Sequence, residues 1–147
     1  METSLIEIGE TAHALRRAFD RRASALGVTR AQWRVLVKLS RQSGLRQVEL
    51  ADMLDVEPIT LCRIIDRLED AGLVERRRDP ADRRAWRLEL TAKAEPLVGK
   101  LRAIANQLVG QAFAGLDDDE VTRLRAMLGK IRENVAVRDP AKRASVA

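Results

Sequence analysis

The sequence predicts a mainly α-helical protein with one small β-hairpin. Apolar residues recur every three or four positions through both ends of the 147-residue chain, which is the period of a helix. They alternate with polar residues near residues 73–90, which is the period of a strand. One cysteine and one histidine can form neither an internal disulfide nor a structural zinc site of four nitrogen or sulfur ligands. A hydrophobic core must therefore hold the fold together.

The first predicted helix covers about residues 4–25 and ends before Gly27. Its apolar face is formed by Leu5, Ile8, Ala12, Leu15 and Phe19. A second helix should begin after Thr29, because Thr29 and Gln32 have the spacing of a capping box, in which two side chains bond the free amides of the first turn. The dipeptide Ser43-Gly44 should end this helix.

Two shorter helices are predicted at about 46–54 and 58–71, joined by a tight turn. Pro58 suits the first position of the second helix, where its missing N–H would have no partner anyway. The layout is that of a helix-turn-helix, whose second helix enters the major groove of DNA. An amphipathic surface helix with a solvated polar face would give the same periodicity. The apolar stripe of the second helix is Leu61, Ile64, Ile65 and Leu68, and its polar side carries Thr60, Arg63 and Arg67.

A β-hairpin over residues 73–90 follows Gly72, with a turn at 79–82. Arg83 and Arg84 near its tip could enter the minor groove of DNA, and Asp82 could hold an arginine side chain in a fixed pose. Arginine-rich edge strands also protect against aggregation, so a purely structural role stays open. The arginines that could neutralise phosphates are Arg76, Arg77, Arg78 and Arg87.

Two further helices complete the pattern. Thr91 should cap a long helix, in which Pro96 should bend the axis or remove one hydrogen bond. Asp117 and Glu120 form a second capping arrangement before the last helix. The four consecutive acidic residues 117–120 are interpreted as cap and first-turn residues that favour the helix dipole, rather than as metal ligands. The tail from Asp139 is charged and short, which is typical of disorder.

The net charge of +5 is a weak indication of a polyanionic partner, because it is unevenly distributed. Residues 44–90 carry 9 basic and 11 acidic groups, yet residues 76–87 hold six arginines against two aspartates. No metalloprotease, nucleophile-elbow, dinucleotide-binding or phosphate-loop motif is present, so we expect neither enzyme activity nor a cofactor. The sequence has no signal-peptide pattern and no apolar run that could span a membrane, so we expect a cytoplasmic protein.

Residues 56–91 closely resemble the recognition helix and wing of the MarR family of winged helix-turn-helix transcriptional regulators. The resemblance implies a single MarR-like domain over 1–147, with a winged helix-turn-helix at 29–90 and a helical dimerisation region at 4–25 and 91–138. It also implies a homodimer on a pseudopalindromic DNA site. The matching motifs are Arg67-Leu68-Glu69, Gly72-Leu73-Val74, Asp82-Arg83-Arg84-Ala85 and Leu90-Thr91.

The sequence departs from the family pattern at two places. Many members have a basic residue where this chain has Ala81, so the wing should make one contact fewer. Members often open the recognition helix with serine or an Asx residue, whereas this chain has Glu57-Pro58. An acid there favours the helix dipole but repels phosphate, so the docking angle or the target should differ.

We therefore predict a sequence-specific DNA-binding transcriptional regulator, a ligand-responsive repressor. Thr60 and Arg63 would read the major groove, and Arg67 would lie toward the backbone. Arg84, together with Arg83, would enter the minor groove, with Arg77 nearby on phosphate. The alternatives are a helical protein-interaction module and a nonspecific nucleic-acid-binding architectural protein.

The family resemblance further implies a small aromatic or phenolic anion as effector, bound between the dimerisation region and the winged part. His13, Arg17 and Trp33 could line such a pocket, although ordinary surface or interface roles would also account for them. Cys62 is interpreted as a small residue near the DNA rather than as a redox sensor. What the family resemblance implies for oxidant-sensing members is a cysteine in the first helix, and this chain has none there.

Overall fold

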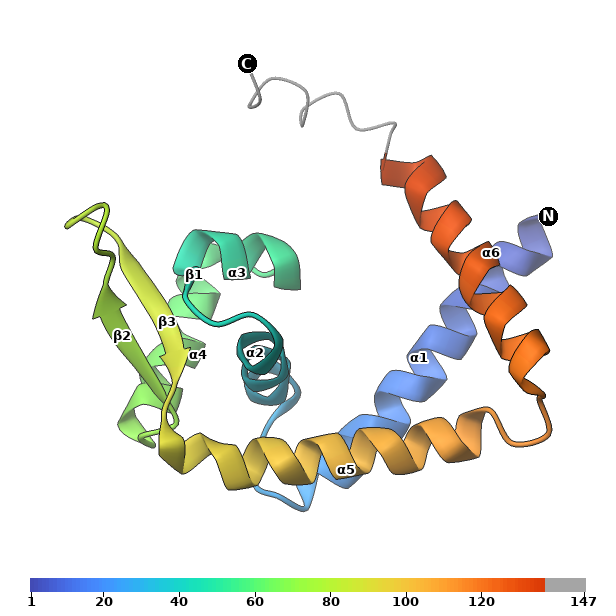
Figure 1. Ribbon diagram of the computed structural model, residues 1–147, viewed down its shortest axis with the longest axis horizontal. Coiled ribbons are helices and arrows are strands. Elements are labelled where there is room, and N and C mark those ends of the chain that lie inside the picture. Colours follow the sequence, from blue (N-terminus) through green and yellow to red (C-terminus); the bar gives the residue numbers. More distant parts are fainter. Residues whose placement is uncertain (137–147) are drawn as a thin grey trace. The chain divides into compact units, whose positions relative to one another are not determined.

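A computed structural model describes residues 1–136 of the chain (Figure 1). The chain divides into two compact units, Met1–Val109 and a second that begins at Gly110. The predicted tail from Asp139 lies outside the described residues. The elements in chain order are α1 (Glu2–Ser24), α2 (Arg30–Arg41), β1 (Leu45–Arg46), α3 (Gln47–Leu54), α4 (Pro58–Asp70), β2 (Val74–Arg78), β3 (Trp86–Leu90), a 3₁₀ turn η1 (Ala92–Ala94), α5 (Glu95–Ala112) and α6 (Asp118–Ala136).

The predicted capping residues define two of the helix starts. Thr29 Oγ1 accepts a hydrogen bond from the Gln32 N–H at 3.2 Å, and Gln32 Oε1 accepts one from the Thr29 N–H at 3.0 Å. Asp117 and Glu120 make the same reciprocal pair before α6, at 2.9 and 2.8 Å. Both capping predictions are confirmed. Gly72 ends α4 with φ +73°, a left-handed conformation that glycine adopts without strain.

The start of α5 differs from the prediction at Thr91, and one of the two effects expected of Pro96 is absent. Thr91 does not cap a helix, because its hydroxyl donates to the carbonyl oxygen of Gly72 at 2.6 Å and so joins the end of β3 to the end of α4. Pro96 removes no helical hydrogen bond, since it is the second residue of α5, and the N–H groups of a first turn have no partner within the helix. The 3₁₀ turn η1 separates Thr91 from the start of α5.

The core of the first unit lies where the C-terminal part of α1, the helices α2, α3, α4 and α5, and the sheet meet. The apolar stripe of α4 packs into it, with Leu61, Ile65 and Leu68 buried and Ile64 half-buried. Since a core side chain of this size stabilises the fold by about 1.5 to 3 kcal/mol, the stripe determines which side of α4 faces outward. The fully buried aliphatic residues include Val35, Leu36, Leu39, Leu50, Leu88 and Leu101.

The sheet contains three strands in the order β1-β3-β2, where the sequence predicted a hairpin alone. Leu45 and Arg46 of β1 pair with Leu88 and Arg87 of β3 in antiparallel register. Leu45 is buried, which fixes this register. The turn between β2 and β3 projects from the rest of the first unit (Figure 1). We call β2, β3 and this turn the wing.

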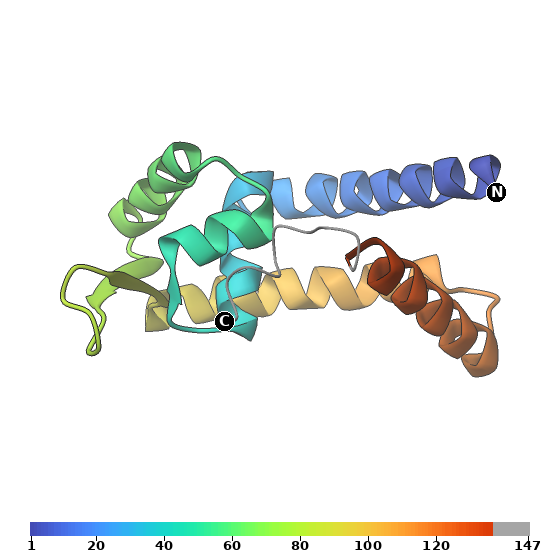
Figure 2. The same ribbon diagram turned by 90° about the horizontal axis from the view of Figure 1, so that it is seen from above.

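Within residues 1–136, no helix is both long and apolar enough to cross a membrane. In the same part of the chain, no three His, Cys, Asp or Glu side chains are grouped as metal ligands would be. The N-terminal half of α1 extends beyond α2, α3 and α4 (Figure 2). Its side chains are exposed from residue 1 to residue 11, so the core of the first unit does not use them.

Candidate nucleic-acid interface

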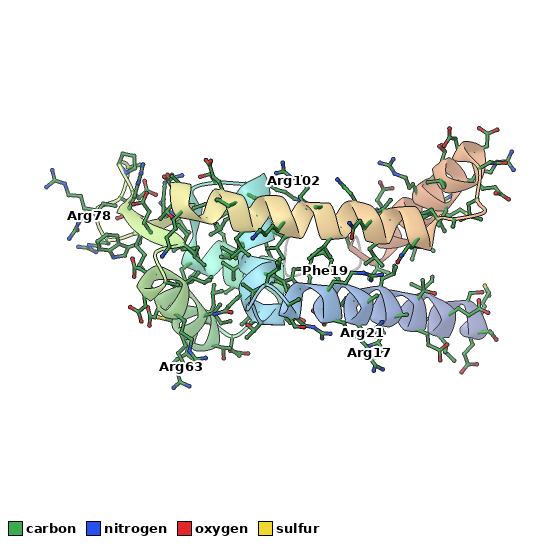
Figure 3. All side chains as sticks on the ribbon, turned by 90° about the horizontal axis from the view of Figure 1, so that it is seen from below. Arg17, Phe19, Arg21, Arg63, Arg78 and Arg102 are labelled. Atoms are coloured by element: carbon green, nitrogen blue, oxygen red, sulfur yellow. The ribbon has the colours of Figure 1, made fainter. Side chains whose placement is uncertain are left out.

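The outward side of α4 carries the three polar residues that the sequence places there. Thr60, Arg63 and Arg67 are all exposed, and Arg63 points away from the body of the first unit (Figure 3). Within the described part of the chain, neither arginine side chain has a hydrogen bond or an ion pair. Two guanidinium groups on one helix face therefore remain available to an external anion or base edge.

The turn before α4 is acidic and tightly bonded. Asp55 adopts a left-handed conformation with φ 51°, and the Val56 N–H donates to the Ala51 carbonyl oxygen at 3.0 Å. Asp52 and Glu57 join Asp55 around a shallow cavity of about 320 Å³. Carboxylates here repel phosphate. The cations of the α4 face thus follow an acidic turn, and the effect of Glu57 on the approach to DNA stays a prediction.

The wing is fastened to the helices by a buried carboxylate that sequence reasoning missed. Asp79 is 1% exposed, and its Oδ2 lies 2.9 Å from Nη2 of Arg46 and 3.1 Å from Nε of Arg87. Its Oδ1 accepts a hydrogen bond from the Ala81 N–H at 2.9 Å. Arg46 belongs to β1 and directly precedes α3. One carboxylate therefore connects the wing turn, β3 and the start of the helix-turn-helix.

Asp79 should make the stability of the protein depend on acid pH. The Ala81 N–H, followed by the Arg46 and Arg87 guanidinium groups, lowers the pKa of Asp79 to about 2, although burial opposes the shift. Because the folded pKa lies below the unfolded value of about 4, the ionised carboxylate stabilises the fold above pH 4. This contribution is lost as the pH falls toward 2. Asp79→Asn should lower the Tm at pH 7, and the difference from the natural protein should shrink below pH 4.

Thermal unfolding of both proteins at a series of pH values measures this effect. Asp82→Asn is the matched control, because Asp82 lies in the same turn and has no ion pair within the described residues. It should lower the Tm less than Asp79→Asn does. Equal Tm values for Asp79→Asn and the natural protein at pH 7 would show that the buried carboxylate does not stabilise the fold.

The prediction that Asp82 holds an arginine side chain is wrong. Asp82 Oδ1 instead accepts a hydrogen bond from the backbone N–H of Arg84 at 3.0 Å, and the Asp82 carbonyl oxygen accepts one from the Ala85 N–H at 3.0 Å. These bonds shape the wing tip. Arg83 and Arg84 are exposed there, and within residues 1–136 neither side chain has a partner. In this turn the carboxylate that does hold guanidinium groups is Asp79, which pairs with Arg46 and Arg87.

Arg76 links the wing to α4 rather than projecting outward. Its side chain is 19% exposed and forms ion pairs with Asp66, at 2.6 Å, and with Glu69. Burial lowers the pKa of Arg76, but the hydrogen bonds and opposite charges of Asp66 and Glu69 outweigh it, so the pKa is raised. Cys62 is half-buried beside the pair, with its Sγ 4.0 Å from Arg76 Nη2. The charge of Arg76 is therefore used within the protein and is not free for phosphate.

The remaining strand arginines also have partners. Arg77 is exposed and lies 2.5 Å from Glu75 and 3.1 Å from Glu89. The guanidinium carbon of Arg78 lies 4.8 Å from the centre of the exposed Trp86 ring, in a cation–π contact. The local excess of positive charge on the wing is thus concentrated near its tip.

The three residues predicted for an effector pocket are not gathered around one cavity. Trp33 packs against Phe19 with ring centres 4.4 Å apart, and its Nε1–H donates to Asp20 Oδ1 at 2.9 Å. His13 and Arg17 are exposed on α1, where Arg17 points outward (Figure 3). A cavity of about 400 Å³ lies instead between α2, the end of β3 and the start of α5. The effector role of the three residues stays a prediction.

The chain is similar in sequence and in structure to several known proteins. The model of the MarR family matches residues 28–86. The transcriptional regulator PA3341 is 37% identical, with 94% of this chain and 100% of that chain covered and a TM-score of 0.84. A MarR transcriptional regulator from Methanosarcina mazei Go1 is 28% identical, with 92% and 98% covered and a TM-score of 0.81. A mutant MarR from E. coli complexed with operator DNA is 30% identical, with 84% and 89% covered and a TM-score of 0.72.

Proposed function

The chain belongs to the MarR family of transcriptional regulators, and we propose that it is a sequence-specific repressor that binds a pseudopalindromic operator as a homodimer. The observation that carries this proposal is the pairing of an outward α4 face with an exposed wing tip, each bearing two unpartnered arginines within the described residues. A similar protein has been solved with operator DNA. Occupying an operator excludes other proteins from it, which is the simplest route to repression.

Each exposed polar residue has a proposed role on DNA. Thr60 and Arg63 lie in the first turns of α4, the part of a recognition helix that contacts base edges, and Arg67 lies one turn further toward the backbone. Arg84 and Arg83 at the wing tip would enter the minor groove. Arg77 would contact phosphate through the exposed part of its side chain, in competition with its two carboxylate partners.

Exposed apolar residues on α1 support the proposed dimer. Leu5 is 70% exposed and Leu15 is 38% exposed, although both belong to the apolar face that the sequence predicts. Ile131 and Val135 of α6 are exposed as well. Large apolar side chains exposed along one face of a helix are typical of interaction sites, and α1 and α6 each carry such residues. We assign residues 29–90 to DNA binding and residues 4–25 and 91–138 to dimerisation, which would set two α4 helices about 34 Å apart.

The proposed effector is a small aromatic or phenolic anion. His13 and Arg17 lie on α1, the helix that we assign to the dimer, so a pocket that includes them would be completed by the second copy of the chain. The exposed Arg17 supplies a cation and the half-buried Trp33 an aromatic ring, which are the two groups that such an anion requires.

Selection of bound duplexes from a random pool, repeated at two salt concentrations, tests the proposed function. We expect enriched sites with two inverted half-sites one helical turn apart, bound more weakly at the higher salt because released counterions favour binding. A salt-dependent response without sequence preference would indicate a nonspecific architectural protein. Absence of DNA binding above simple charge attraction would indicate a helical protein-interaction module.

A further inference from the structure

Ile59 is an apolar residue that the fold itself does not use. It lies in the first turn of α4 and is 68% exposed. The other aliphatic residues of this helix are buried or half-buried in the core, and they are Leu61, Ile64, Ile65 and Leu68. Ile59 lies outside their stripe, so no repacking of the core would cover it. A branched side chain of this size gains free energy only when a partner removes it from water.

Ile59 lies on the same face of α4 as the proposed base-reading residue Arg63. Arg63 follows four residues later and is therefore its neighbour on the same helix face. Pro58 restricts the backbone just before Ile59, and the Leu61 N–H donates to the Glu57 carbonyl oxygen at 3.0 Å. The first turn of α4 thus presents Ile59 at a well-defined place, beside a guanidinium group that points away from the protein (Figure 3).

The surroundings of Ile59 favour a base edge over the phosphate backbone. The carboxylates of Asp55 and Glu57 lie in the turn before it, and they repel phosphate. In the major groove, the apolar group that a base presents is the C5-methyl of thymine. We propose that Ile59 packs against a thymine methyl group and so selects thymine at one position of each half-site. This inference rests on the proposed DNA-binding function and adds a specificity-determining residue to it.

Replacement of thymine by deoxyuridine removes the methyl group and leaves every hydrogen-bonding atom of the base in place. In the duplex recovered by selection, each thymine of one half-site is replaced in turn, and binding is measured by fluorescence anisotropy. We expect one replacement to weaken binding by about fourfold, the factor that corresponds to one buried methyl group. With Ile59→Ala, the same replacement should have no effect, which a double-mutant cycle measures directly.

Val48→Ala is the matched control, because Val48 is a branched residue of similar exposure on α3. This variant should keep the fourfold effect of the replacement. Circular dichroism and Tm check that both variants stay folded, which their exposure favours. Ile59 does not read thymine if no replacement weakens binding, or if the effect persists in Ile59→Ala and so belongs to the methyl group of Thr60. In either case the natural protein still binds its selected site, so failure of the Ile59 proposal would leave the proposed DNA-binding function intact.

Discussion

Replacing Leu5 and Leu15 together by glutamate is expected to convert the proposed dimer into a monomer and to weaken binding to the proposed operator on the order of 100-fold. Both residues lie on the apolar face of α1 and are exposed in the single chain, so charge at these positions costs little in the folded monomer. In a dimer the same carboxylates would be buried without partners, which is strongly unfavourable. Each winged part would then bind its half-site alone and lose the gain from simultaneous binding.

Light scattering after size-exclusion chromatography gives the mass, and anisotropy titration gives the affinity. A matched variant with Thr3→Glu and Ala14→Glu adds the same charge to exposed positions of α1 outside the apolar face. This control should remain a dimer with unchanged affinity. A Leu5 and Leu15 double variant that still has the dimer mass would show that this face of α1 does not form the interface.

The helices could be predicted because their signals are local. The capping pairs Thr29 with Gln32 and Asp117 with Glu120 are each three residues apart, and their geometry follows from the first turn of a helix. The outward placement of Arg63 could also be predicted, because the periodicity of α4 separates its core stripe from its polar side. These features depend on one segment at a time.

The attachment of the wing could not be predicted, because it depends on residues far apart in the chain. Asp79 is separated from Arg46 by 33 positions, so nothing near Asp79 distinguishes it from an ordinary turn acid. The two residues of β1 are too few to show an alternating pattern. The burial of Asp79 and the third strand are two aspects of one tertiary contact, since β1 carries the Arg46 that pairs with Asp79.

The arginine count of the hairpin overestimated the charge available to DNA. Arg76 is held by Asp66 and Glu69 of α4, and Arg87 by the buried Asp79. The fold brings these acidic residues into contact with the arginines, which a count of charges along the sequence cannot show. A signal for Ile59 was present in the sequence, because it falls outside the apolar stripe of α4, but periodicity does not distinguish a base contact from an isolated surface residue.

Arg84→Ala is expected to weaken operator binding by about 5- to 150-fold, the range for the loss of a good arginine contact. The Arg84 side chain is exposed at the wing tip and has no partner within residues 1–136, while its N–H is held by Asp82. Its guanidinium group can therefore leave water for a narrow minor groove without breaking a contact inside the protein. The loss should be largest on A·T-rich flanks, where the groove is narrow and its potential most negative.

Arg77→Ala is the matched control, because it removes the same charge from an exposed residue that already pairs with Glu75 and Glu89. We expect a smaller loss for Arg77→Ala, similar on all flanking sequences, since a phosphate contact carries no base information. Affinity measured on A·T-rich and G·C-rich flanks at two salt concentrations separates the two residues. If folded Arg84→Ala binds as the natural protein does, or loses no more on A·T-rich than on G·C-rich flanks, the minor-groove role of Arg84 is wrong. The wing would then act through backbone charge alone.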